Sequence, residues 1–258
     1  MSIFVNYMAK IGIFDSGAGG LSVFREIRKV LPDEDYIYYS DSANCPYGEK
    51  PMEFIIDRCR KITDMLISEG AEIIVVACNT ATAAAIRTLR EEYSIKFIGM
   101  EPAIKPAAQF TKTGTVGVLA TAGTLKSEKY LKHKEKYASD IRIIEHVGDG
   151  FVELVEKGII SGPEAESIVR KSLEPLLDAG ADTIVLGCTH YPFLSDVIIG
   201  LAGPEIRLID PAPAIAKHLI EVMDEEGIAY GSADSKSSHI DLRTSGDPDI
   251  LEKIFRQL

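Results

Sequence analysis

The chain has 258 residues, of which 46% are apolar and 26% are charged, and its formal net charge is −11. This composition is typical of a globular protein with a substantial core and excludes a disordered chain, and no apolar run reaches the roughly 18 residues that span a bilayer. The negative charge and the scattered basic residues argue against nucleic acid as a partner. The first ten residues lack a secretory signal, which predicts a cytoplasmic protein with reduced cysteines and no membrane partner.

Short apolar segments alternate with helical patterns along the chain. The strand candidates are 11–14, 36–39, 73–77, 97–100, 116–120, 141–145, 183–187, 207–209 and 239–243. Between them, 51–69 and 163–179 have the spacing of amphipathic helices, and we expect Pro175 to kink the second one. The tail from residue 214 predicts a helix and a polar loop over 231–238 before the last strand. This alternation predicts parallel sheets with helices on both faces.

Two segments of the chain are nearly the same. Residues 70–80 and 180–190 each read as a buried strand followed by a cysteine, Cys78 or Cys188, and 11–17 resembles 116–122 more weakly. The repeat favours an α/β fold of two duplicated doubly wound lobes, each with a mostly parallel sheet flanked by helices and with the active site in the cleft between them.

Proline-containing junctions near 100–102 and 210–213 predict where the chain passes between the lobes, with Pro102 and Pro106 stiffening the first junction. We therefore expect one lobe of residues 1–99, completed by 211–258, and a second lobe of residues 100–210. The tail after 214 could extend either lobe.

Both repeated cysteines follow the carboxyl ends of predicted strands, where ligands gather in parallel sheets. A free thiol has a pKa near 8.5 and is only about one-thirtieth ionised at pH 7, so each cysteine needs an acid–base partner. Asp15 and His190 are the candidates. The glycine-rich loop after Asp15 permits close approach of an anion. Alternatively, Asp15 or Ser16 caps the helix that begins near Leu21, and His190 is a structural histidine.

The other thiols and the glycines form no recognised cofactor motif. Cys59 lies on the apolar stripe of a helix and is expected to be inert, whereas Cys45 precedes a turn-rich loop and could be exposed. Cys188 and His190 could supply two zinc ligands, but no cluster supplies the others, so we predict no metal. The glycine loop fits neither the dinucleotide nor the P-loop fingerprint, and we predict no cofactor.

Two thiols that face each other across a cleft can invert a carbon acid without a cofactor. One thiolate removes a proton while the opposite thiol returns one, so one sulfur must be charged and the other protonated at each turnover. Hydroxyl and amide groups would hold the carboxylates and spread the carbanion charge. The candidates for this are Ser16, Asn79, Thr80, Thr121 and Thr189.

Four segments resemble the signature segments of the glutamate racemases, in order and along nearly the whole chain. They are Asp-Ser-Gly-x-Gly-Gly at 15–20, Pro-Tyr-Gly at 46–48, Ala-Cys-Asn-Thr at 77–80 and Gly-Cys-Thr-His-Tyr-Pro at 187–192. The resemblance implies a cofactor-independent enzyme that interconverts L- and D-glutamate and supplies D-glutamate for bacterial peptidoglycan. It also allows a homodimer.

By this resemblance, Cys78 takes the proton from D-glutamate with Asp15 nearby, and Cys188 takes it from L-glutamate with the help of His190. The residues implied to contact the substrate are Ser16, Pro46, Tyr47, Gly48, Asn79, Thr80, Thr121 and Thr189. A further family glutamate, in a Leu-Val-Glu segment, matches Glu156 and is expected to act beside His190. A Cys-Pro pair common just upstream is missing here, which leaves Glu153 as an alternative.

Asn44 stands where the family commonly has arginine, and Cys45 adds a third thiol, but neither lies on the proposed proton path.

Three other functions remain open on the sequence. A cysteine hydrolase or acyltransferase would need only one nucleophile and one histidine. A two-lobed binding protein would need no thiols. A related racemase or decarboxylase could act on a shorter acidic substrate such as aspartate.

Overall fold

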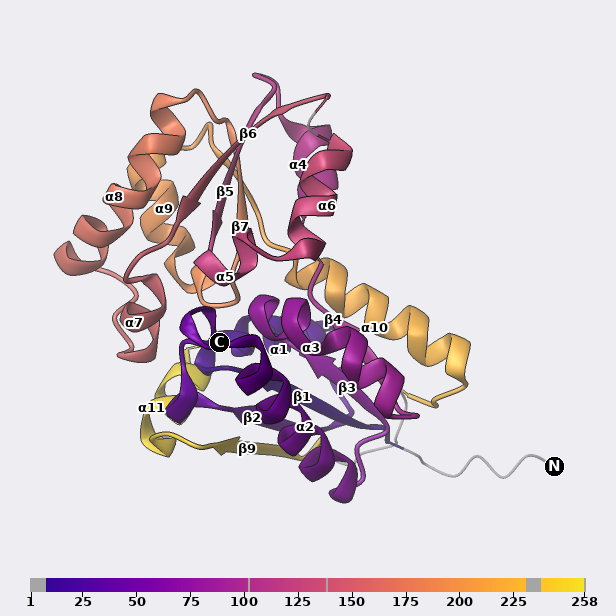
Figure 1. Cartoon of the computed structure of the whole chain (residues 1–258). Coiled ribbons are helices and arrows are strands. Elements are labelled where there is room, and N and C mark those ends of the chain that lie inside the picture. The colour runs from indigo at the N-terminus through magenta and orange to yellow at the C-terminus, as the bar shows by residue number, and fades with distance from the viewer. Residues whose placement is uncertain (1–7, 102, 138, 231–237, 258) are drawn as a thin grey trace.

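The strands form two separate parallel sheets, one in each of the two lobes that Figure 1 presents one above the other. This computed structural model describes residues 8–101, 103–137, 139–230 and 238–257. The first sheet contains β1 (Lys10–Asp15), β2 (Asp35–Ser40), β3 (Ile73–Val76), β4 (Lys96–Gly99) and β9 (Ile240–Thr244). The second contains β5 (Thr115–Ala120), β6 (Arg142–Val147), β7 (Thr183–Gly187) and β8 (Arg207–Ile209).

The two sheets have the same strand order, which supports the duplication inferred from the sequence. The order is β4-β3-β1-β2-β9 in the first sheet and β6-β5-β7-β8 in the second. Numbered within each lobe, both read 2-1-3-4, and β9 is an added strand beside β2. The repeated segments occupy equivalent places, because β1 matches β5 and β3 matches β7. The predicted fold class, two lobes with parallel sheets flanked by helices, is confirmed.

The expected strands are all present, and their ends differ by one or two residues. The largest difference is in β6, which continues to Val147 because His146 and Val147 pair with Leu119 and Ala120 of β5. The expected loop over 231–238 lies, apart from its last residue, outside the described residues, as do Pro102 of the first junction and residues 1–7.

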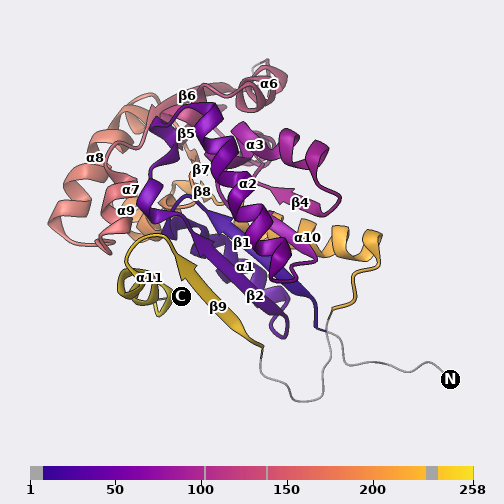
Figure 2. The same cartoon turned by 60° about the horizontal axis from the view of Figure 1, so that its bottom comes forward.

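Helices cover both faces of each sheet (Figures 1 and 2). They are α1 (Leu21–Val30), α2 (Met52–Ser68), α3 (Asn79–Glu92), α4 (Ile104–Phe110), α5 (Ala122–Leu125), α6 (Glu128–Tyr137), α7 (Phe151–Glu156), α8 (Pro163–Asp178), α9 (Ser195–Ala202), α10 (Ala212–Glu226) and α11 (Pro248–Phe255). Pro175 lies inside α8, three residues before its end. Within the described ranges, no helix combines the length and apolar character needed to cross a bilayer.

Each sheet is sandwiched between two apolar clusters. In the first lobe, α1, α10 and α11 pack on one face, through residues such as Phe24 and Leu219, and α2 and α3 cover the other. In the second lobe, α7, α8 and α9 pack on one face, and α4 and α6 cover the other. Burial of these apolar side chains fixes the strand ends that carry the polar residues described below.

The chain passes from the first sheet to the second after β4 and returns after β8, since α10 packs against α1. The last strand, β9, pairs with β2, so the tail adds to the first sheet. The lobe boundaries expected from the sequence, 1–99 with 211–258 and 100–210, stay a prediction.

Candidate active site

The carboxyl ends of the central strands carry the expected catalytic residues. In each sheet the chain leaves the first strand in one direction and returns to the third strand on the other side, and ligands bind at such a switch point. In the first lobe, Asp15 ends β1 and Cys78 follows β3; in the second, Thr121 follows β5 and Cys188 follows β7. The duplication therefore provides two equivalent strand edges.

The two edges enclose one small cavity. It is lined by Ser16, Pro46, Tyr47, Gly48, Cys78, Asn79, Thr80, Thr121, Val152, Cys188, Thr189 and His190. The structure thus brings together both cysteines, His190 and every residue expected to contact the substrate. Val152 was not expected, and Asp15 and Glu156 lie behind the lining. The cavity volume is about 10 Å³, roughly the space of one water molecule.

On the first-lobe side, the Cys78 thiol is held by a short chain of polar contacts. Cys78 is the N-cap of α3, and its Sγ accepts a hydrogen bond from the Ala81 N–H at 3.4 Å. The thiol donates to Ser16 Oγ at 3.5 Å, and Ser16 donates to Asp15 Oδ1 at 3.3 Å. Burial, together with the negative charge of Asp15, raises the pKa of Cys78 well above its ordinary value.

Asp15 is fully buried, and its carboxylate contacts both lobes. Oδ2 accepts hydrogen bonds from the Gly20 N–H at 2.7 Å and from Thr189 Oγ1 at 3.3 Å. The first contact is made with Gly20, which is itself the N-cap of α1, so neither Asp15 nor Ser16 occupies the cap position that the alternative expected. Burial raises the pKa of Asp15, although the charge of His190 opposes this. This carboxyl group can therefore hold a proton close to Cys78.

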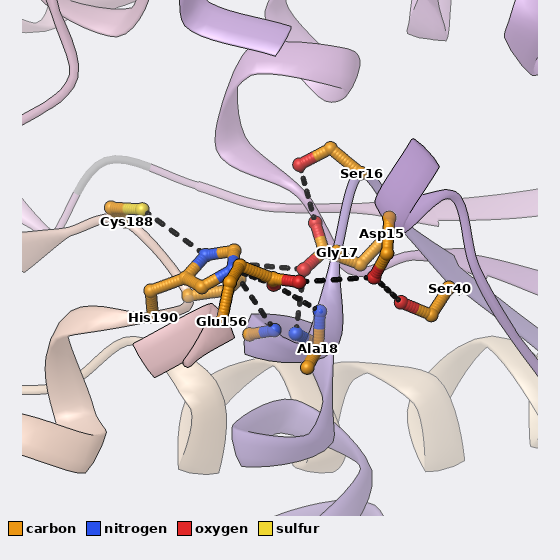
Figure 3. Close-up of polar contacts among 12 residues, drawn as sticks. Asp15, Ser16, Gly17, Ala18, Ser40, Glu156, Cys188 and His190 are labelled. Atoms are coloured by element: carbon orange, nitrogen blue, oxygen red, sulfur yellow. Dashed lines mark hydrogen bonds and ion pairs between the residues drawn. The ribbon is translucent and has the colours of Figure 1, made fainter. Parts of the chain in front are cut away.

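On the second-lobe side, Cys188, His190 and Glu156 form a chain of side chains (Figure 3). Cys188 Sγ lies 3.7 Å from His190 Nδ1, and His190 Nε2 lies 2.6 Å from Glu156 Oε1. Burial alone would lower the pKa of His190, but its hydrogen bonds to Cys188, Cys45 and Glu156 raise it well above the ordinary value. The imidazolium form is thus favoured beside Cys188.

Glu156 is anchored by the first lobe. It accepts hydrogen bonds from the Ala18 N–H at 2.6 Å and from Ser42 Oγ at 3.0 Å. Burial would raise its pKa, but these bonds and the charge and hydrogen bond of His190 lower it overall. Glu153, the alternative from the sequence, is exposed on α7. The structure therefore brings Glu156, and not Glu153, to His190.

The glycine-rich loop after β1 accommodates groups of the protein itself. A Cβ atom on Gly19 would lie 2.3 Å from His190 Nδ1, and one on Gly17 would lie 2.2 Å from Glu156 Oε1. Glycine is therefore required for these side chains of the second lobe to approach the loop. We expected an anion to bind here, and the anion in this structure is the carboxylate of Glu156.

Sequence reasoning missed the group that supports the loop at 45–48. Asp41 accepts hydrogen bonds from Tyr47 Oη at 2.6 Å and from Arg58 at 2.8 and 2.9 Å. Ser245, which follows β9, donates to the same carboxylate at 2.9 Å. The Asp-Ser-Ala-Asn run at 41–44 is typical of a turn and gave no sign of this network.

Polar atoms of both lobes meet on the cavity lining. Thr80 Oγ1 and Thr121 Oγ1 share a hydrogen bond of 3.1 Å across the two lobes, in which either hydroxyl can donate. Asn79 Oδ1 is buried and has no hydrogen-bond partner among the described residues. A buried acceptor without a partner is uncommon, so Asn79 is a candidate for binding a donor of the ligand.

One group of metal-ligating side chains stands at the edge of the cavity, whose lining includes its histidine but not its cysteine or glutamate. Among the described residues, Cys45, Glu156 and His190 have ligand atoms that all lie within 4.8 Å of one another. This group shares His190 with the Cys188 and His190 pair that the sequence suggested as zinc ligands, but its other two residues are different.

Comparisons with known proteins agree with the motif resemblance. The family model for Asp/Glu/Hydantoin racemase matches residues 11–219. A glutamate racemase of Herpetosiphon aurantiacus is 46% identical over 244 residues and covers 95% of each chain. One from Ectopseudomonas mendocina is 49% identical over 218 residues, which is 84% of this chain and 83% of the relative.

Solved structures have the same architecture. The Escherichia coli glutamate racemase, in complex with L-glutamate and the activator UDP-MurNAc-Ala, superposes with a TM-score of 0.86 at 34% identity and covers 97% of this chain and 95% of its own. The Francisella tularensis enzyme in complex with D-glutamate has a TM-score of 0.81 at 28% identity, with 96% and 92% covered. The chain therefore belongs to the Asp/Glu/Hydantoin racemase family and is a racemase, which makes it an isomerase.

Proposed function

We propose that this racemase interconverts L- and D-glutamate by proton transfer at the α-carbon between Cys78 and Cys188, without a cofactor. The observation that carries the proposal is that the two thiols line one cavity from opposite lobes. A planar carbanion between two sulfur atoms can be protonated from either face, so inversion needs no other group at the reacting carbon. The names of the relatives, glutamate racemases at 46% and 49% identity, support glutamate as the substrate.

In the direction from D- to L-glutamate, Cys78 removes the α-proton as a thiolate. Burial and the charge of Asp15 raise the pKa of this thiol, so it must pass its own proton to a nearby acceptor before it can act. The hydrogen bonds from Cys78 to Ser16 and from Ser16 to Asp15 provide a path. Because burial also raises the pKa of Asp15, this carboxylate accepts a proton more readily than an exposed one.

Cys188 then returns a proton to the opposite face of the carbanion. The raised pKa of His190 favours the imidazolium, which can resupply the proton to Cys188 across the 3.7 Å contact. Glu156 orients the ring through its hydrogen bond to Nε2. In the direction from L- to D-glutamate the two thiols exchange roles, as microscopic reversibility requires.

Neutral groups would bind the charged ends of the substrate. Asn79 Oδ1 has a free acceptor for the ammonium group, and the hydroxyls of Thr80, Thr121 and Thr189 can donate to carboxylates. The cavity has room for about one water molecule, so the lobes must separate to admit glutamate.

The wider role follows from the resemblance. We propose that the enzyme acts in the cytoplasm and supplies D-glutamate for peptidoglycan, and thus for cell wall biogenesis and cell shape. A homodimer is compatible with this role.

Proton NMR of L-glutamate in heavy water tests the reaction. With reduced enzyme and no added cofactor, we expect the α-proton signal to disappear while D-glutamate accumulates to an equal share. An unchanged spectrum with folded protein would contradict the proposal. L-Aspartate, which is shorter by one methylene, is the matched control, and faster exchange with aspartate would assign the alternative substrate.

A further inference from the structure

One thiol near the site is neither of the two that exchange protons with the substrate. Cys45 precedes the loop of Pro46 and Tyr47 in the first lobe, and it is half-buried rather than enclosed. It lies beside Glu156, since a Cβ atom on Gly17 would be 3.0 Å from Cys45 Sγ and 2.2 Å from Glu156 Oε1. Its thiol is also close enough to His190 to contribute to the raised pKa of that ring.

Three different ligand types therefore meet at this point. The thiol of Cys45, a carboxylate oxygen of Glu156 and a ring nitrogen of His190 all lie within 4.8 Å of one another. Zinc prefers sulfur and nitrogen ligands with bond lengths of about 2.0–2.3 Å, which spaces the ligand atoms about 3.3–3.7 Å apart in a tetrahedral site. Shifts of about 1 Å would thus convert the cluster into a site with three protein ligands and one open position.

The cluster is accessible from solvent and spans both lobes. The Glu156 side chain is 20% exposed and Cys45 is half-buried, so two of the three ligands reach the surface beside the buried His190. Cys45 belongs to the first lobe, whereas Glu156 and His190 follow strands of the second sheet. An ion bound here would hold the lobes together at the cavity.

We propose that Cys45, Glu156 and His190 form an inhibitory site for a thiophilic divalent cation such as Zn²⁺. Coordination occupies Nε2 of His190, releases the Nε2 proton and the Cys45 thiol proton to solvent, and replaces the hydrogen bond between Nε2 and Glu156 with two bonds to the ion. The ring is then held neutral with its one proton on Nδ1, so the imidazolium that resupplies a proton to Cys188 across the Nδ1 contact no longer forms. The bound ion also opposes the separation of the lobes that admits substrate.

Calorimetric titration of Zn²⁺ into the reduced, metal-free protein tests the binding, and racemase assays at buffered Zn²⁺ test the inhibition. We expect one ion per chain and loss of activity that a chelator reverses. Cys45→Ser should bind Zn²⁺ about tenfold more weakly or worse, a loss of about 1.4 kcal/mol or more, and its activity relative to its own metal-free rate should persist to correspondingly higher Zn²⁺. Cys59→Ala, which removes a thiol buried in the first lobe away from the cluster, should bind as the wild type does.

Equal affinity and inhibition in the wild type and in Cys45→Ser would overturn the proposal, because Cys45 would then not be a ligand of the ion. Glu156→Gln gives a second readout by calorimetry alone, and weaker binding is expected because an amide oxygen is a poorer zinc ligand than a carboxylate. Unchanged binding in this variant would also overturn it. The inhibition rests on the proposed role of His190, but the calorimetric result does not, so failure of the reaction mechanism and failure of the ion site are distinguishable.

Discussion

The two thiols occupy equivalent places in duplicated lobes, yet their surroundings carry opposite charge. Beside Cys78 lies Asp15, a carboxyl group whose pKa is raised because burial outweighs its hydrogen bonds and the charge of His190. Beside Cys188 lies His190, whose hydrogen bonds raise its pKa despite burial. An anionic neighbour favours the protonated thiol, and a cationic neighbour favours the thiolate.

This asymmetry matches the requirement of the two-thiol reaction, in which only one sulfur carries a proton at a time. Glu156 completes the contrast, because its pKa is lowered by His190, the Ala18 amide and Ser42 even though burial opposes them. The pKa values of two carboxyl groups in one site, Asp15 and Glu156, are thus shifted in opposite directions. Duplication supplied the symmetric positions of the thiols, whereas Asp15 and His190 differ from Ala120 and Thr80 at the equivalent positions of the other copies.

Removal of either sulfur should reduce the rate of racemisation more than any other change. If both thiols transfer protons, Cys78→Ser and Cys188→Ser should each lower the rate of racemisation by about 10²–10⁴-fold, because a hydroxyl is a far weaker acid than a thiol. Circular dichroism of glutamate solutions measures the rate. Near-normal activity in either variant would instead indicate a mechanism with one nucleophile. Cys59→Ala, which alters only the core, is the control.

Gly19→Ala should damage the second-lobe side alone. The added Cβ would lie 2.3 Å from His190 Nδ1, so the ring must move away from the loop and its contact with Cys188 changes, and misplacement by about 1 Å can cost about 10²-fold in rate. Gly200→Ala is the matched control, since no atom lies within 4 Å of its new Cβ. Similar activity of the two variants would show that the position of His190 is unimportant.

Isotope effects distinguish the step at Cys78 from the step at Cys188, which the rates of the variants cannot do. The equilibrium constant between enantiomers is one, so any variant must change kcat/KM equally in both directions. His190→Asn should slow the steps at Cys188, which increases the α-deuterium effect with L-glutamate and decreases it with D-glutamate. Asp15→Asn should do the reverse. The same pattern in both variants would contradict the assignment of one helper to each thiol.

Local patterns in the sequence sufficed for the strands and the two cysteines. Runs such as 73–77 and 183–187 are buried on both faces, and such strands are apolar throughout, so they stand out without tertiary information. Helix α11 was missed although Asp247 before Pro248 is a helix-start signal, and Asp247 indeed accepts a hydrogen bond from the Asp249 N–H.

Contacts between distant parts of the chain could not be predicted from local sequence patterns. Glu156 and the Ala18 amide are 138 residues apart, and Ser245 reaches Asp41 from the far end of the chain. No periodicity links such pairs, because only the packing of the two lobes brings them together. The proximity of Cys45 to His190 escaped the sequence for the same reason.

A change at Glu156 alone should alter the stability of the protein, and this is the smallest of the expected effects. Glu156→Gln should lower the free energy of unfolding by about 1–3 kcal/mol near pH 7, because it weakens charge-assisted hydrogen bonds to His190, Ala18 and Ser42. Since the folded pKa of Glu156 is lowered, its stabilisation is present above the ordinary value of 4.5 and is lost as the pH falls through the folded pKa. The raised pKa of His190 favours the charged form of this partner.

Guanidinium unfolding of the wild type and of Glu156→Gln, compared between about pH 7 and about pH 4, measures this difference. The difference in unfolding free energy between the two proteins should become smaller toward the lower pH. Asp15 is present in both proteins and does not contribute to this difference. Glu153→Gln is the matched control, because Glu153 is exposed on the same helix and should cost less than about 0.5 kcal/mol at either pH. A gap that is independent of pH would mean that Glu156 contributes through packing, and its charge would then have no part in holding the imidazolium beside Cys188.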